Sequence, residues 1–197
     1  MSIKRNIMIK RLIILASGSG TNAENIIKYF QNTKTARVTY VLSNNKNAKV
    51  LERAQRLHID NASFSKSDFF ESDKVLDLLV EKADYIVLAG FLWKVPRKII
   101  QKFPNRIINI HPALLPKYGG KGMYGSHVHQ AVVDNKEEIS GISIHFVNEY
   151  YDEGAIIFQS ETAVMPSDSP EDVAQKIHKL EYEHFPKVIE KIVLAND

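Results

Sequence analysis

The chain has 197 residues, 44% of them hydrophobic, and a formal net charge of +3 from 26 basic and 23 acidic residues. This charge balance does not favour a nucleic-acid partner, and no apolar stretch in the sequence reaches the length of a membrane span. The absence of cysteine excludes disulfides and thiol catalysis, and it suits a reducing cytoplasm, where we expect this protein. The length of the chain fits one domain over residues 1–197, with an N-terminal tail over residues 1–10.

The first part of the chain alternates short apolar runs with segments whose apolar residues recur at helical spacing. We predict strands over residues 12–15, 38–42, 61–64, 85–89 and 106–111, and helices over residues 22–30, 48–57, 68–81 and 96–103. Strands that alternate with helices indicate βαβ units, and continuous apolar runs indicate strands covered on both faces. This part is therefore predicted to form a parallel sheet flanked by helices.

The pattern changes after Pro116. A glycine-rich loop leads to a predicted helix over residues 126–133, followed by strands over residues 142–147 and 155–163. The last helix begins with Ser169 as N-cap and Pro170 at its first position, and Pro186 is expected to kink or split it. The expected fold is α/β: a doubly wound, mostly parallel Rossmann-like sheet with a late antiparallel strand pair.

Asn109 and His111 end the fifth predicted strand. Side chains of a strand alternate between faces, so these two point the same way, and Pro112 should end the strand. An amide donor beside an imidazole suits the stabilisation of an oxyanion and the movement of a proton. The alternative is that both side chains are satisfied by nearby backbone. Asp152 could supply a carboxylate that raises the pKa of His111, or could belong to an ordinary solvated turn.

The segment over residues 18–23 matches the G-x-G-x-x-A dinucleotide fingerprint, which is a weak signal alone. The second predicted strand ends in residues 43–45 without an acidic residue, and no lysine follows Gly20 as a nucleotide-hydrolase loop requires. A strand–loop–helix turn remains, whose backbone N–H groups favour a single phosphate. The alternative is a tight turn that needs glycine only for its conformation.

Three further features allow two interpretations each. His127 and His129 have a His-x-His spacing, but no third ligand pattern follows, so we expect no metal. His145 is interpreted as a packed strand residue. Trp93 follows the fourth predicted strand, where it could stack on a planar ligand or anchor the strand to the next helix.

Four segments together resemble the phosphoribosylglycinamide formyltransferases, the folate-dependent enzymes of purine synthesis. These segments cover residues 17–22, 87–91, 109–116 and 145–154, and the resemblance extends from about residue 12 to residue 192. Asn-x-His-Pro with a downstream Asp is shared by the wider superfamily of formyltetrahydrofolate-using enzymes. The opening glycine loop and His-Phe-Val are more particular to the glycinamide enzymes.

The resemblance implies a role for each matching position. The catalytic residues would be Asn109, His111 and Asp152. The residues that bind phosphoribosylglycinamide would be Gly20, Thr21, Asn22 and Glu181, and those that bind the co-substrate 10-formyltetrahydrofolate would be Leu92, Trp93, Lys94, Val95, Asn148 and Tyr151. The implied partners are small molecules, without nucleic acid, membrane or metal, and the chain would act as a monomer or homodimer.

The implied mechanism is attack of the glycinamide amine on the formyl carbon, with Asn109 and protonated His111 stabilising the tetrahedral oxyanion and Asp152 keeping His111 charged. A formyltetrahydrofolate hydrolase and a non-catalytic folate- or nucleotide-binding module remain alternatives, and a dinucleotide-binding oxidoreductase is a more distant one. The chain departs from the common family pattern in a longer glycine-rich loop over residues 119–126, in Trp93 where many members carry Arg, and in Glu153 in place of a glycine.

Overall fold

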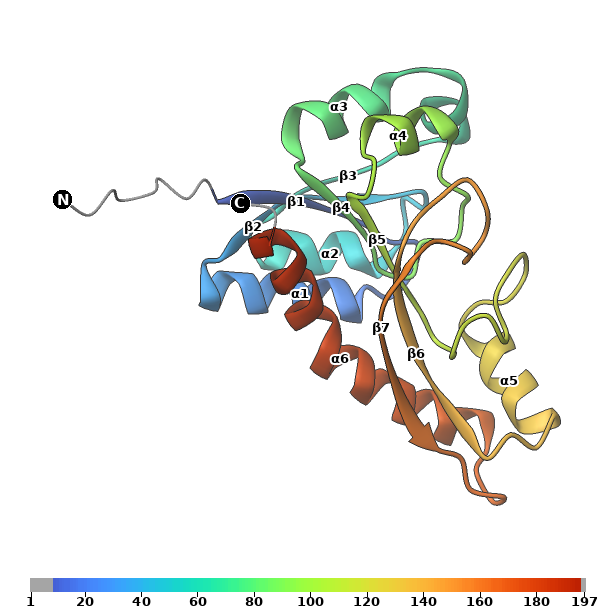
Figure 1. Ribbon diagram of the computed structural model, residues 1–197. Coiled ribbons are helices and arrows are strands. Elements are labelled where there is room, and N and C mark those ends of the chain that lie inside the picture. Colours follow the sequence, from blue (N-terminus) through green and yellow to red (C-terminus); the bar gives the residue numbers. More distant parts are fainter. Residues whose placement is uncertain (1–8, 196–197) are drawn as a thin grey trace.

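The computed structural model describes residues 9–195, so most of the expected N-terminal tail lies outside the described residues (Figure 1). Seven strands form one sheet in the order β3-β2-β1-β4-β5-β6-β7. The first five strands are parallel, whereas β6 runs antiparallel to β5 and β7 antiparallel to β6. The predicted fold class is confirmed. The strands are β1 (Lys10–Leu15), β2 (Ala36–Ser43), β3 (Asp60–Ser63), β4 (Tyr85–Leu88), β5 (Ile107–His111), β6 (Ile139–Phe146) and β7 (Ile156–Ala163).

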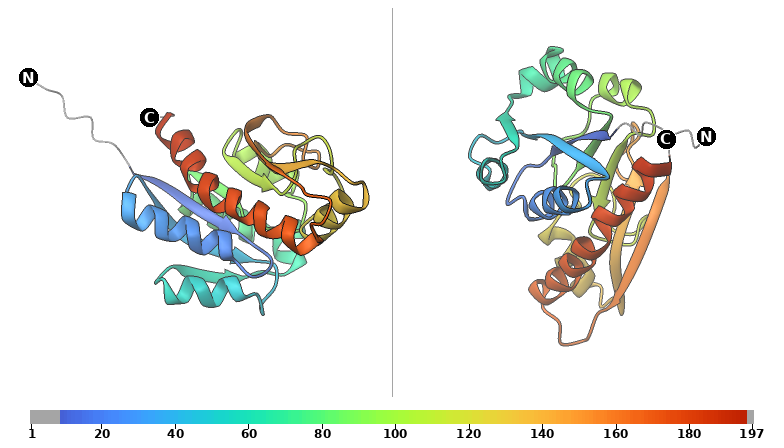
Figure 2. Two further views of the ribbon diagram at one scale, coloured as in Figure 1. Left: turned by 90° about the horizontal axis from the view of Figure 1, so that it is seen from below. Right: turned by 90° about the vertical axis from the view of Figure 1, so that its left-hand side faces the viewer.

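Helices cover both faces of the sheet (Figure 2). Alternate residues of β1 show the reason, because Leu12 and Ile14 belong to one buried cluster and Ile13 and Leu15 to the other. The first cluster includes residues of α1 (Thr21–Thr33), α2 (Lys49–Arg56), α5 (Ser126–Asp134) and α6 (Pro170–Ala195). The second includes residues of the π-helical turn η1 (Ser67–Glu71), α3 (Lys74–Lys82) and α4 (Arg97–Lys102).

The single helix predicted over residues 68–81 is wrong, because η1 and α3 replace it. Ser72 takes an extended conformation, with φ −114° and ψ 173°, which no helix accommodates. Ser72 and Asp73 are residue types that favour helix ends, because their side chains compete for backbone hydrogen bonds. The apolar periodicity continues across this break and therefore did not reveal it.

Pro186 was expected to kink or split the last helix; α6 runs unbroken over 26 residues, so of these two outcomes the split does not occur. A proline leaves the carbonyl four residues earlier without its helical donor. Here Nδ2 of Asn25 donates to that carbonyl, on Tyr182, at 3.0 Å. The predicted start is confirmed, since Ser169 and Asp172 exchange hydrogen bonds as a capping box. No helix among the described residues is long and apolar enough to cross a membrane.

Candidate active site

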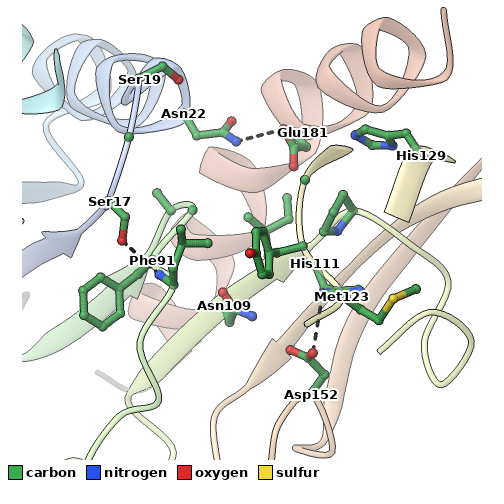
Figure 3. A pocket seen from close by; sticks show the side chains of 18 of the residues that line it. Ser17, Ser19, Asn22, Phe91, Asn109, His111, Met123, His129, Asp152 and Glu181 are labelled. Atoms are coloured by element: carbon green, nitrogen blue, oxygen red, sulfur yellow. Dashed lines mark hydrogen bonds and ion pairs between the residues drawn. The ribbon is translucent and has the colours of Figure 1, made fainter. Parts of the chain in front are cut away.

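The carboxyl ends of the parallel strands open onto a cavity of about 630 Å³. Open α/β sheets bind ligands at this edge, outside the strand ends. Figure 3 shows Asn109, His111 and Asp152 in one part of the cavity, and Asn22 and Glu181 in another. The lining comes from the loop after β1 and the start of α1, the loop after β4, the end of β5, the glycine-rich loop before α5, α5 itself, the loop before β7, and α6.

The loop after β1 presents an uncapped helix N-terminus to this cavity. Gly20 is the N-cap of α1 with φ 75°, and a Cβ there would lie 2.4 Å from Cγ2 of Val50, so glycine is required. No side chain caps α1, and the backbone N–H groups of Gly20, Thr21 and Asn22 have no acceptor among residues 9–195. This turn has the free donors that an anion needs.

The end of β5 places His111 beside Asp152, an approach that the sequence could not establish. Nδ1 of His111 lies 3.7 Å from Oδ2 of Asp152, and its Nε2 lies 2.7 Å from the carbonyl oxygen of Tyr118. The same carboxylate accepts a hydrogen bond of 2.9 Å from the backbone N–H of Gly120. Asp152 is therefore held by the glycine-rich loop over residues 119–126, and His111 by the residue that precedes this loop.

Burial lowers the pKa of His111 more than the Asp152 carboxylate and the Tyr118 carbonyl raise it. The prediction that Asp152 raises this pKa is confirmed, but burial outweighs the carboxylate, so the net pKa lies below its ordinary value and the neutral imidazole is favoured near neutral pH instead of the expected charged ring. Burial acts to raise the pKa of Asp152, whereas the nearby His111 ring and the hydrogen bond from Gly120 act to lower it. A neutral imidazole beside a carboxylate is suited to accepting a proton.

His145 is a packed strand residue, as predicted, but its contacts with two of the site residues were not foreseen from the sequence. It lies directly opposite Asn109 in the β5–β6 pair, and only 2% of it is exposed. Its Nε2 lies 3.1 Å from Nδ2 of Asn109 and 3.6 Å from Oδ1 of Asp152. The strand register that creates these contacts is not visible in the sequence. Residues two apart in a strand share a face. This rule, which pairs Asn109 with His111, could also have indicated that Ser143 and His145 lie on one face of their strand.

Glu181 joins Asn22 in the same cavity, as expected. Oε2 of this buried carboxylate accepts hydrogen bonds of 2.9 Å from Nδ2 of Asn22 and from Nδ1 of His178. The bond to Glu181 raises the pKa of His178. His129 also lines this region, where burial lowers its pKa. The described residues contain no group of three or more His, Asp or Glu side chains that could hold a metal ion.

The residues expected at the folate divide between several places. Leu92 and Tyr151 line the main cavity, while Lys94 and Val95 line a neighbouring cavity of about 250 Å³. Nζ of Lys94 lies 5.5 Å from the ring centroid of Tyr151, which links the two cavities. The remaining two line neither cavity: Trp93 packs among four phenylalanines, and Asn148 accepts a hydrogen bond from the backbone of Tyr150.

Two departures from the common family pattern have a visible consequence. The loop over residues 119–126 forms part of the cavity wall. Glu153 is exposed, so a side chain is tolerated there, whereas a Cβ on Gly154 would lie 1.6 Å from the carbonyl oxygen of Phe146. Position 154 therefore requires glycine, because the backbone of residue 146 approaches it closely, whereas position 153 accepts a side chain.

Comparison with known proteins agrees with this geometry. The formyl transferase family model matches residues 10–189. The chain is 37% identical to the chloroplastic phosphoribosylglycinamide formyltransferase of Arabidopsis thaliana, over 91% of this chain and 64% of that protein. It is 36% identical to phosphoribosylglycinamide formyltransferase of Haemophilus influenzae, over 92% of this chain and 86% of that protein. The crystal structure of glycinamide ribonucleotide transformylase 1 from Symbiobacterium toebii superposes with a TM-score of 0.87 at 30% identity, covering 95% of this chain and 89% of that one. The chain belongs to the formyl transferase family.

Proposed function

We propose that this chain transfers the formyl group of 10-formyltetrahydrofolate to the amine of 5′-phosphoribosylglycinamide, as one formyltransferase domain over residues 1–197. The observation that carries the proposal is the meeting of Asn109, His111 and Asp152 in one cavity with the uncapped start of α1. An oxyanion donor, a base and a phosphate-binding turn are the parts that this transfer requires. Membership of the formyl transferase family and the names of the relatives support the same reaction.

The two substrates occupy different parts of the cavity. The phosphate accepts hydrogen bonds from the backbone N–H groups of Gly20, Thr21 and Asn22, and Glu181 contacts the phosphoribosylglycinamide between this turn and the reacting atoms. The folate enters along the other wall, where we assign its contacts to Leu92 and Tyr151 in the main cavity and to Lys94 and Val95 in the smaller one. The contacts predicted for Trp93 and Asn148, which line neither cavity, stay predictions. The free cavity beside Leu92 and Tyr151 supports this direction of entry.

The reaction forms one C–N bond and breaks another. The amine of the glycinamide attacks the formyl carbon, and Asn109 donates a hydrogen bond to the oxygen of the tetrahedral intermediate. Neutral His111 takes the amine proton, and the resulting imidazolium, paired with Asp152, stabilises the same oxygen. The proton then reaches N10 of the folate as the C–N10 bond breaks. One donor of this kind contributes about 2.7–4 kcal/mol in the transition state.

A three-part assay separates this function from its alternatives. The protein is mixed with 10-formyltetrahydrofolate, with and without phosphoribosylglycinamide, and loss of the formyl group is followed by absorbance. We expect loss only when the ribonucleotide is present. Loss without the ribonucleotide would indicate a hydrolase, and binding of both ligands without any loss would indicate a non-catalytic binding module.

Three predictions about the protein in the cell accompany this proposal. A cytoplasmic location, a monomeric or homodimeric state, and catalysis without a metal all follow from the resemblance and from the composition. None of the residues assigned to the reaction requires a second chain, because the trio and the phosphate turn come from one cavity of one chain.

A further inference from the structure

His145 has a fixed arrangement of protons on its ring. Its Nδ1 lies 2.8 Å from the backbone carbonyl oxygen of Phe146, which can only accept a hydrogen bond. Nδ1 must therefore carry a proton. In a neutral imidazole the other nitrogen, Nε2, then carries a lone pair.

That lone pair faces the side-chain amide of Asn109. Nε2 of His145 lies 3.1 Å from Nδ2 of Asn109, within hydrogen-bond distance, whereas Oδ1 of Asp152 lies at 3.6 Å, beyond it. A lone pair accepts from the NH₂ group of the amide and repels its oxygen. The side chain of Asn109 makes no other hydrogen bond among residues 9–195, so its second N–H is left for a ligand in the cavity.

We propose that His145 is a positioning residue, whose Nε2 lone pair orients the amide of Asn109 so that an N–H group faces the developing oxyanion. The inference rests on the proposed formyl transfer and deepens it. Burial makes the orientation strict, because only 2% of His145 is exposed and water cannot replace it as the acceptor. The surrounding polar groups are Asn109, Asp152 and the Phe146 carbonyl, and His111 lies beside Asp152.

Two substitutions of His145 test the roles of its two ring nitrogens separately. In His145→Gln, the amide end of the side chain reaches the place of Nε2 and its oxygen accepts from Asn109. In His145→Asn, the shorter side chain reaches only the place of Nδ1, so it keeps a donor for Phe146 and loses the acceptor. We expect kcat to fall about tenfold in His145→Asn and to stay within about threefold of the parent in His145→Gln, with the KM of the ribonucleotide unchanged in both.

A merely structural role predicts the opposite order, because the contact with Phe146 would then matter and His145→Asn would be the milder change. Equal losses of kcat in both variants, or a loss that follows the melting temperature, would overturn the proposal. The parent protein also gives a readout that needs no activity. Long-range ¹H–¹⁵N correlation spectra, assigned by comparison with His145→Gln, should show a neutral ring protonated on Nδ1. A ring protonated on both nitrogens would refute the assigned role.

These experiments also distinguish the inference from the proposed function. A parent protein that transfers no formyl group while the spectrum shows the Nδ1-protonated ring would refute the function and leave the orientation of Asn109 supported. A parent protein that is active while both variants behave alike would refute the inference and leave the function intact.

Discussion

In the proposed reaction, the imidazole of His111 begins as a base. Only 4% of the residue is exposed, and burial holds its pKa below the ordinary value of 6.5 in spite of the nearby carboxylate. In that proposal the ring gains its charge during the reaction, when it takes the proton of the attacking amine. Charge that appears beside the oxyanion at that moment stabilises the transition state more than the ground state.

This assignment predicts the shape of the pH profile. The neutral form of His111 is lost as the pH falls through its lowered pKa, and the substrate amine also loses reactivity when it is protonated, with an ordinary pKa of about 8. We expect kcat/KM to rise from about pH 5 to about pH 8 and then to stay level up to about pH 9. A resting imidazolium would instead make the rate fall as the pH rises above about 7, and steady-state assays across this range decide between the two.

Helix α2 contacts the turn that we propose to bind the phosphate. Nε of Arg53 donates to the carbonyl oxygen of Ser19 at 2.8 Å, and the N–H of Val50 donates to the carbonyl oxygen of Gly18 at 3.2 Å. The C=O and N–H groups of a trans peptide unit point in opposite directions. Holding the Ser19 carbonyl toward Arg53 therefore turns the N–H of Gly20 away from α2.

We expect Arg53→Ala to raise the KM of the phosphorylated substrate about tenfold with little change in kcat, because a hydrogen bond from a charged group is worth about 1.5–3 kcal/mol. Arg56→Ala is the matched control. Arg53 also pairs with the carboxylate of Glu24. Arg56 lies on the same helix and approaches that carboxylate at 3.7 Å, but makes no contact with Ser19 among the described residues. If both variants raised KM equally, the effect would come from positive charge near the phosphate, and the orienting role of Arg53 would be wrong.

The α/β architecture could be predicted because strand and helix periodicity are local. The run over residues 12–15, for example, is apolar at every position, and both of its faces are covered. The break at Ser72 and the unbroken passage of α6 through Pro186 were missed, because each depends on backbone geometry or on a distant donor such as Asn25. Local pattern contains neither kind of information.

Some features of the site could likewise be predicted from the sequence, and others could not. The uncapped turn at Gly20 and the shared face of Asn109 and His111 follow from local sequence. The approach of Asp152 to His111, across a sequence separation that no spacing rule covers, depends on how β6 and β7 pair. The net direction of the His111 pKa depends on burial in the finished molecule, so the sequence could name the partner but not the stronger effect.

In the proposed function, the phosphate turn, the folate wall and the catalytic trio act as one site. Single-turnover formyl transfer from 10-formyltetrahydrofolate to phosphoribosylglycinamide, compared among the parent protein, Asn109→Ala and Asp152→Asn, tests this most directly. We predict that each substitution slows transfer by a factor of about 10²–10³, while the Kd of the ribonucleotide, measured by calorimetry, stays within about threefold. Near-normal transfer in either variant, with both ligands bound, would contradict the account.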